Sequence, residues 1–250
     1  MSFKLATSLT SVQRTRGADI SLGLVLALVA GAINAGGFLA VGQYTSHMTG
    51  LVSSMADHLV LGHVTVVLSA LAGVLSFLTG AMTCSVMVHF SRKRKLRTEY
   101  AAPLLLEAFL LLLFGLLGSQ IQWVRAVFVP LTVVILCFLM GLQNALITKI
   151  SNSTIRTTHV TGILTDLGIE LGKMIYINRT HGQDTLHVRA DKNKFKRLGG
   201  LLVFFFVGGI IGAYGFSRFG FTAVLPFSML LMLIGVAGLI APPNTNKAAR

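Results

Sequence analysis

Two histidine-centred segments carry the side chains that are best suited to chemistry. Thr45–Ser53 and Thr157–Thr165 share Thr, His, Thr and Gly at matching positions, 112 residues apart from His47 to His159. Histidine titrates near neutral pH and can carry a proton. A helix that begins at such a segment would add N–H groups and partial positive charge. The pattern predicts a site for an anion or a polar neutral solute, and its predicted binding side chains are His47, Thr49, His159 and Thr161.

A structural alternative stays open for the same residues. Each histidine could instead hydrogen-bond a neighbouring carbonyl and fix a helix break, and each threonine could bond backward to a helix carbonyl. Gly50 and Gly162 follow the threonines and are expected to permit close packing rather than to contact a ligand.

A second repeat lies upstream of each histidine segment. Gly31–Ala35 matches Gly141–Ala145 at an offset of 110, and each segment contains an asparagine, Asn34 or Asn144. A buried amide can bind a solute or hold helices together. Both roles are open, and we count both asparagines among the predicted binding residues.

Acidic residues are rare within the apolar runs. Glu107 lies inside Ala101–Ser119 with no basic residue within a helical turn. An acid inside a membrane segment suggests a functional role. We therefore expect Glu107 to carry a proton or to partner His47 or His159, unless it lies near enough to a helix end to reach water. Glu170 has Lys173 three residues later and is interpreted as a structural ion pair.

Long apolar runs must position these residues. A membrane-spanning helix needs about 20 apolar residues. Two less apolar stretches, Ser46–Leu61 and Thr158–Ile177, contain the histidine segments and could be crossings, re-entrant half-helices or interfacial helices. The six strong runs are Ser21–Gly42, Val64–Phe90, Ala101–Ser119, Ala126–Ile147, Leu198–Phe216 and Phe219–Ala241.

Composition places these runs in a lipid bilayer. The 250 residues are 54% hydrophobic and only 12% charged, whereas soluble domains have roughly 25% charged residues. The net charge of +13 could indicate nucleic-acid binding. However, if six runs cross from a cytoplasmic N-terminus, all of the 21 Lys and Arg residues except Arg125 and Arg218 fall inside. This positive-inside pattern predicts six crossings, cytoplasmic termini and no nucleic-acid partner.

The repeats divide the chain into two halves of opposite orientation. Ser76 and Gly80 match Gly208 and Gly212 at an offset of 132, which makes a third match in the same order. Small residues at this spacing predict packing surfaces, either between the halves or between subunits. Three crossings per half would invert the second half relative to the first. The predicted parts are a cytoplasmic tail (1–20) before an uncleaved first helix, a first repeat (21–120), a second repeat (121–241) with a basic cytoplasmic loop (178–197), and a second tail (242–250).

Motifs of enzymes and cofactor sites are missing from the sequence. There is no P-loop, no Gly-x-Ser-x-Gly and no His-Glu-x-x-His or Cys-x-x-Cys spacing. Cys84 and Cys137 lie in apolar runs and are interpreted as small hydrophobic residues. We therefore expect no enzymatic activity, no cofactor and no metal.

The motifs together resemble the YoaK-like family of bacterial inner-membrane proteins of unknown function. The resemblance rests on Gly-x-x-Asn-Ala with His-Met-Thr-Gly, and on Gly141–Ala145 with Arg156–Gly162, and it covers nearly the whole chain. It implies a bacterial inner-membrane location and no particular substrate. Family members often carry Asp at Asn34 and Asn at Leu51, so a charge at the first site is absent here.

These observations predict an all-α membrane protein with about six transmembrane helices. The two inverted three-helix repeats would each hold an extra polar re-entrant or broken helix. The favoured function is a secondary transporter or channel for a small polar or anionic solute, with proton coupling open. The alternative is a non-transporting scaffold, sensor or assembly subunit. Whether one chain or a homodimer holds the pathway is also open.

Overall fold

The structure is a computed structural model that describes residues 16–94, 96, 98–121, 125–151, 155, 157–176 and 188–240. Within these residues it contains helices and no strand, so the prediction of an all-helical chain is confirmed there. The helices are α2 (Arg16–Val41), α3 (Met48–Val60), α4 (Val64–Lys93), α5 (Ala101–Ile121), α6 (Arg125–Ile150), α7 (Val160–Ile175), α8 (Lys192–Phe219), the 3-10 helix η1 (Gly220–Val224) and α9 (Leu225–Ile240).

Each predicted apolar run forms a helix, and both polar stretches form shorter helices, α3 and α7. By length and composition, four stretches of the described residues are candidate membrane spans: Gly17–Ala40, Val64–Lys93, Pro130–Ile150 and Lys192–Ile240. The last has 49 residues, about twice what one crossing needs, and it joins α8 to α9 through η1. The apolar helix Ala101–Leu116 in α5 is shorter than these.

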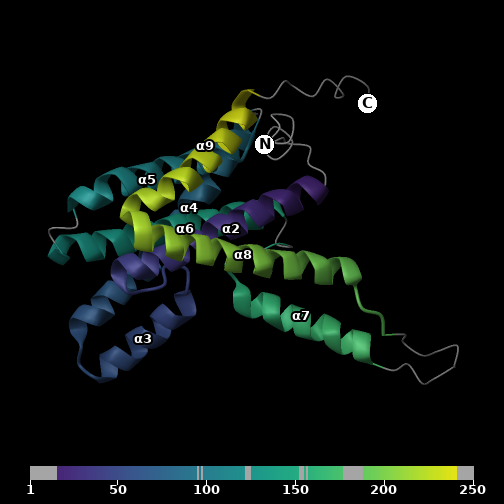
Figure 1. Ribbon diagram of the computed structural model, residues 1–250, viewed down its shortest axis with the longest axis horizontal. Helices are drawn as coiled ribbons and strands as arrows, with labels where there is room; N and C mark the ends of the chain where they lie inside the picture. The colour runs from purple at the N-terminus through teal and green to yellow at the C-terminus, as the bar shows by residue number, and fades with distance from the viewer. Residues whose placement is uncertain are drawn as a thin grey trace, which may run out of the picture.

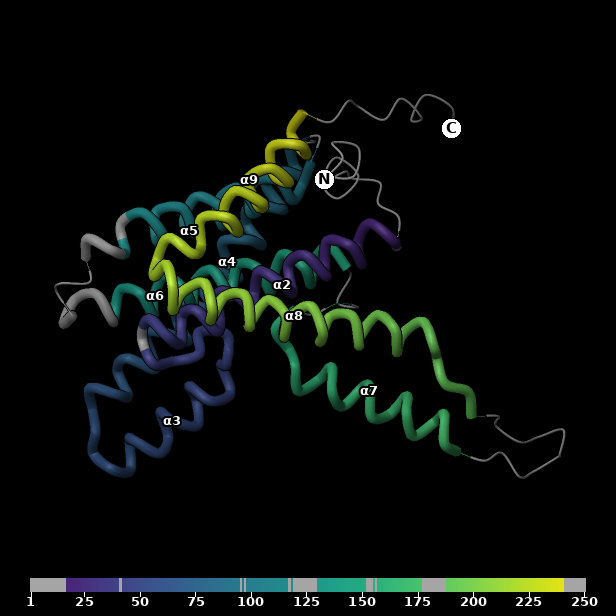
Figure 2. Tube along the Cα trace, viewed as in Figure 1, coloured from purple at the N-terminus to yellow at the C-terminus, as the bar shows by residue number. Residues whose placement is uncertain are grey.

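The long helices pair across the two halves of the chain. α2 packs along α8, and α4 packs along α6 (Figure 2). The remaining pair, α5 and α9, lies together at one side of the bundle (Figure 1). The hydroxyl of Ser228 in α9 donates to the carbonyl of Ala108 in α5 at 2.6 Å. The first helix of each half therefore packs against a helix of the other half.

Glycines bring the paired helices into backbone contact. A Cβ at Gly31 would overlap the carbonyl oxygen of Phe205, and a Cβ at Gly141 would overlap that of Phe77. Gly80 and Gly208 meet the carbonyls of Phe138 and Leu28 in the same way. The predicted small-residue faces therefore pack within the chain, between its halves.

These contacts correct the third sequence match by one helical turn. Gly80 and Gly208 occupy equivalent places, because each meets a carbonyl of the opposite first helix. Their offset is 128 (208 − 80), four less than the offset of 132 taken from the sequence. Four residues return an α-helix to nearly the same face, which is why the shifted match also aligned small residues.

The two shorter helices leave the bundle in different directions. α3 packs on α4 and α7 packs on α8. Figure 1 shows that α3 and α7 begin near the middle of the molecule and diverge. The side chains that begin both helices are consequently brought together.

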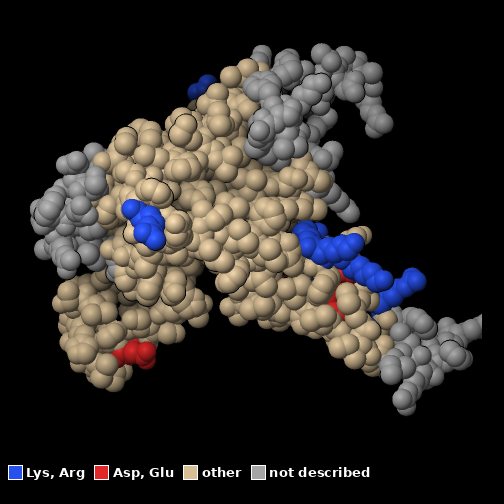
Figure 3. Space-filling model, in the orientation of Figure 1, with Lys and Arg blue, Asp and Glu red and all other residues tan. Residues whose placement is uncertain are grey.

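Residues other than Lys, Arg, Asp and Glu cover most of the visible surface of the described part of the chain (Figure 3). Large side chains of α4 and α8 are exposed, among them Leu78 (53%), Met82 (58%) and Phe206 (67%). In the same view, Lys and Arg gather along the beginning of α8. A lipid environment accounts for such a surface, because exposed apolar stripes of this length are unfavourable in water.

Candidate functional site

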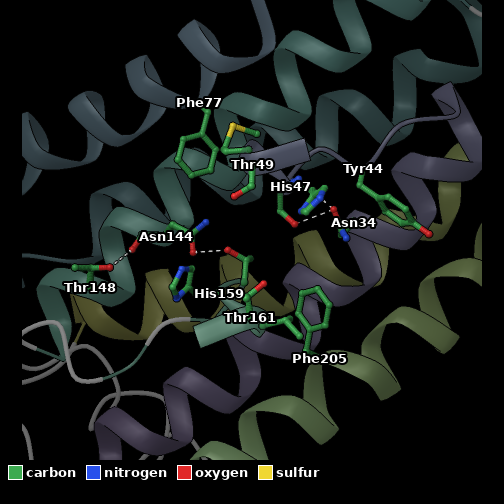
Figure 4. A pocket seen from close by; sticks show the side chains of 14 residues that line it. Asn34, Tyr44, His47, Thr49, Phe77, Asn144, Thr148, His159, Thr161 and Phe205 are labelled. Atoms are coloured by element: carbon green, nitrogen blue, oxygen red, sulfur yellow. Dashed lines mark hydrogen bonds between the residues drawn. The ribbon is translucent and has the colours of Figure 1, made fainter. Parts of the chain in front are cut away.

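A cavity of about 680 Å³ lies where α3 and α7 begin. Residues at matching positions in the two halves of the chain line this cavity, as Figure 4 shows for the labelled side chains. All six sequence-predicted binding residues line it. The matched pairs are Asn34 and Asn144, Ser46 and Thr158, His47 and His159, Met48 and Val160, Thr49 and Thr161, and Phe77 and Phe205.

The two histidines occupy equivalent backbone positions. His47 is the N-cap of α3 and His159 is the N-cap of α7, and neither side chain caps its helix. Their carbonyls accept the first helical bonds, from Leu51 at 3.1 Å and from Ile163 at 3.0 Å. Within the described residues neither imidazole makes a hydrogen bond, so the alternative that each locks a neighbouring carbonyl finds no support.

The glycine of each motif accommodates the histidine ring. A Cβ at Gly50 would overlap the ring of His47, and a Cβ at Gly162 would overlap the ring of His159. Each imidazole therefore lies against the first turn of its own helix. This close contact explains why glycine stands three residues after histidine in both segments.

The asparagines hold the loops that precede the two helices. The Oδ1 atom of Asn34 accepts hydrogen bonds from the Ser46 backbone N–H at 3.1 Å and from its hydroxyl at 2.8 Å. Oδ1 of Asn144 accepts from the Thr158 hydroxyl at 2.7 Å, and Figure 4 shows dashed hydrogen bonds at both asparagines. A backbone N–H can only donate, so the amide oxygen of Asn34 faces Ser46. Each asparagine thus fixes a loop while it lines the cavity.

The cavity offers hydrogen-bond donors and lacks carboxylate, ammonium and guanidinium side chains among its lining residues. Its lining residues include no Asp, Glu, Lys or Arg. The first N–H groups of a helix lack partners within the helix, and no histidine side chain caps them here. Together with two amide NH₂ groups and the hydroxyls of Thr49 and Thr161, they form a site rich in hydrogen-bond donors. Such a site suits an anion or a polar neutral molecule.

Glu107 lies apart from this cavity. It is 0% exposed, and neither carboxyl oxygen has a hydrogen-bond partner among the described residues. It is not among the residues that line the cavity. The structure therefore does not bring Glu107 to His47 or His159, and it excludes the expectation that Glu107 lies close enough to a helix end to reach water.

The acids of α7 serve its attachment to α8. Glu170 accepts from Lys173 at 2.9 Å and from the Asp191 backbone N–H at 2.8 Å. The hydrogen bond from the Asp191 N–H, and after it the one from Lys173, holds the pKa of the Glu170 carboxyl below its ordinary value. Lys194 adds an ion pair with Asp166 at 3.3 Å. The structural interpretation of Glu170 is thus supported, with more partners than the sequence indicated.

Sequence reasoning missed several residues of the cavity. Tyr44 and Thr148 line it, and Phe77 and Phe205 face it from α4 and α8. The phenylalanines are 128 residues apart (205 − 77), so the correct offset of the repeat would have identified them as a pair. Tyr44 has no such signal, because its counterpart position belongs to Arg156, which lies outside the described residues.

Potential metal ligands do not gather in the described part of the chain: no group of three or more His, Cys, Asp or Glu side chains is found there. One histidine pair does form, at the turn between α3 and α4, where Nδ1 of His58 lies 2.9 Å from Nδ1 of His63. It closes this turn and lies outside the main cavity.

Comparison with known proteins identifies the family. Residues 22–237 match the family described as "Protein of unknown function (DUF1275)". The chain belongs to this family. It is also 25% identical over 156 residues to the UPF0700 transmembrane protein YoaK of Bacillus subtilis (strain 168), which covers 62% of this chain and 68% of that protein. No solved structure matches. The YoaK-like resemblance is confirmed, and with its apolar helices the chain is a multi-pass membrane protein.

Proposed function

We propose that this protein is a secondary transporter or channel whose cavity binds a small polar or anionic solute during passage across the membrane. The observation that carries the proposal is the pairing of the cavity's side chains, position by position, between the two halves. A scaffold would need neither a cavity of this size nor matched polar side chains at its centre. We expect no enzymatic step, since the lining residues supply no nucleophile paired with a base.

Inverted halves would explain the pairing. In this arrangement six helices cross the bilayer, and α3 and α7 are half-helices that enter from opposite sides and meet at the midplane. Transporters built from inverted repeats place their sites where such half-helices begin. The proposal is supported by the equivalent contacts of Gly31 with Phe205 and of Gly141 with Phe77, and by the divergence of α3 and α7 (Figure 1).

The chemistry of the cavity favours an anion among polar solutes. Two helix N-termini contribute partial positive charge, and no carboxylate among the lining residues opposes it. Irregular backbone at membrane depth is tolerated where it lines a polar cavity, as the loops before α3 and α7 would. The distribution of Lys and Arg supports an inner-membrane location with both termini cytoplasmic.

Uptake into proteoliposomes tests the proposal. Natural protein and a His47→Ala, His159→Ala double variant are compared with halides, nitrate, formate, acetate, urea and glycerol as probes. We expect saturable uptake of at least one probe, reduced about tenfold or more in the double variant, because both half-helix sites lose their imidazole. A His58→Ala, His63→Ala variant removes the same number of imidazoles outside the main cavity and should keep the uptake.

Two results would contradict the proposal in different ways. Equal uptake by the natural protein and the folded double variant would remove the cavity histidines from the pathway. Uptake no faster than in protein-free liposomes for every probe would favour a scaffold or sensor.

A further inference from the structure

Two glutamates are buried in this protein, and their surroundings are opposite. The side chain of Glu170 is 2% exposed, and it accepts hydrogen bonds from Lys173 and from the Asp191 N–H. Glu107 is 0% exposed and has no hydrogen-bond partner for either oxygen within the described residues. On its own helix it lies among Leu104, Ala108 and Leu111, all 0% exposed.

An ionised carboxylate at Glu107 would be very unfavourable. Removing a charge from water is strongly unfavourable when no partner compensates it, and a neutral carboxyl avoids most of this cost. α5, α9 and η1 contain no other charged or titratable residue. On the other two neighbours of α5, Cys84 of α4 lies within electrostatic range of Glu107, and Lys149 of α6 lies within electrostatic range of Cys84. Among the described residues, neither carboxyl oxygen of Glu107 has a hydrogen-bond partner that would stabilise the anion.

Glu107 also lies beside the helices that shape the cavity. α5 packs against both α4 and α6. α4 contributes Phe77 to the cavity, and α6 contributes Asn144 and Thr148. α4 and α6 are in backbone contact at Gly80 and Gly141, so a shift of one is passed to the other. We call the packed contact of α5 with α4 and α6 the junction. A charge at Glu107 would draw water or a cation into this junction, whereas a protonated Glu107 leaves it free of water.

We propose that Glu107 is a proton-binding site, separate from the solute cavity, and that its proton is linked to the cavity through α4 and α6. Glu107 holds a proton at neutral pH when the junction is closed and releases it when water enters. The proton site rests on the burial of Glu107 and on the lack of a hydrogen-bond partner for its carboxyl oxygens among the described residues. The linkage rests on the proposed function, because it assumes that the cavity opens and closes during passage of a solute.

Infrared spectroscopy of the purified full chain tests the proton site. A neutral carboxyl has a C=O stretch that an ionised carboxylate lacks. We expect this band at about neutral pH in the natural protein, its loss in Glu107→Gln, and its decline as the pH is raised. Glu170→Gln is the matched control, and it should leave the band unchanged because Glu170 is ionised.

A band that is absent from the folded natural protein, or that survives in Glu107→Gln, would overturn the proton site. The linkage is tested separately with Thr49→Cys, at an exposed position that lines the cavity. The rate at which this cysteine reacts with a water-soluble thiol reagent is followed against pH. We expect the pH dependence of this rate to differ about threefold or more between the Glu107 chain and the Glu107→Gln chain. Identical pH dependence would overturn the linkage, and neither measurement depends on the uptake assay.

Discussion

Gly50 and Gly162 decide where the two imidazoles of the cavity lie. Each gives up its side-chain space to a histidine ring three residues earlier, so the ring lies against the first turn of α3 or α7. The asparagines fix the loop residue that directly precedes each histidine, since Asn34 accepts from Ser46 and Asn144 accepts from Thr158. At the scale of single residues, the glycines and the asparagine amides thus set the positions of the two imidazoles in the cavity.

A methyl group at Gly162 should displace the imidazole with little effect on folding. Gly162→Ala raises helix propensity by up to about 1 kcal/mol, which offsets the rearrangement of one exposed ring. We expect unchanged thermal unfolding and a loss of most of the solute uptake. Gly168→Ala, in the same helix with nothing within 4 Å of the added Cβ, is the control. Equal uptake in the two variants would show that the position of the ring is unimportant.

At the scale of elements, α3 and α7 are attached to their neighbours by different chemistry. α7 is tied to the beginning of α8 by Glu170, which accepts the backbone N–H of Asp191. α3 turns into α4 through Gly62, whose φ is +75°, and the turn is closed by His58 and His63. The two halves therefore place α3 and α7 in matching positions but attach them through different interactions.

The tie between α7 and α8 should weaken in acid. Because the pKa of Glu170 is lowered in the folded chain, its contribution is present above the ordinary pKa of a glutamate and is lost as the pH falls through the folded value. We expect the protection factor for hydrogen exchange at the first turn of α8, which is the intrinsic rate of an amide divided by its observed exchange rate at the same pH, to be several-fold lower below about pH 4 than at neutral pH.

Glu170→Gln should show the lower protection factor already at neutral pH. Asp166→Asn removes only an exposed ion pair and should change little. Protection that is independent of pH in the natural chain would mean that Glu170 does not hold the tie.

At the scale of the whole molecule, two halves of one chain enclose one cavity. The sequence predicted the helices well, because apolar length and polar interruptions such as Ser46–Leu61 are local signals. It also predicted six residues of the cavity, because they recur in pairs. The register between Gly80 and Gly208 was missed by one turn, since small residues recur every four positions and only tertiary contact distinguishes them. The isolation of Glu107 from His47 could not be predicted, because it depends on how α5 packs.

The inverted arrangement of the two halves predicts the side of the membrane from which two equivalent positions can be reached. Ser53 in α3 and Thr165 in α7 are both exposed, and the natural cysteines, Cys84 and Cys137, are buried. Single Ser53→Cys and Thr165→Cys variants in oriented membrane vesicles are treated with a membrane-impermeant thiol reagent. Inverted halves around one pathway predict labelling of Ser53→Cys from the external side and of Thr165→Cys from the cytoplasmic side. Labelling of both from the same side would contradict the inverted arrangement.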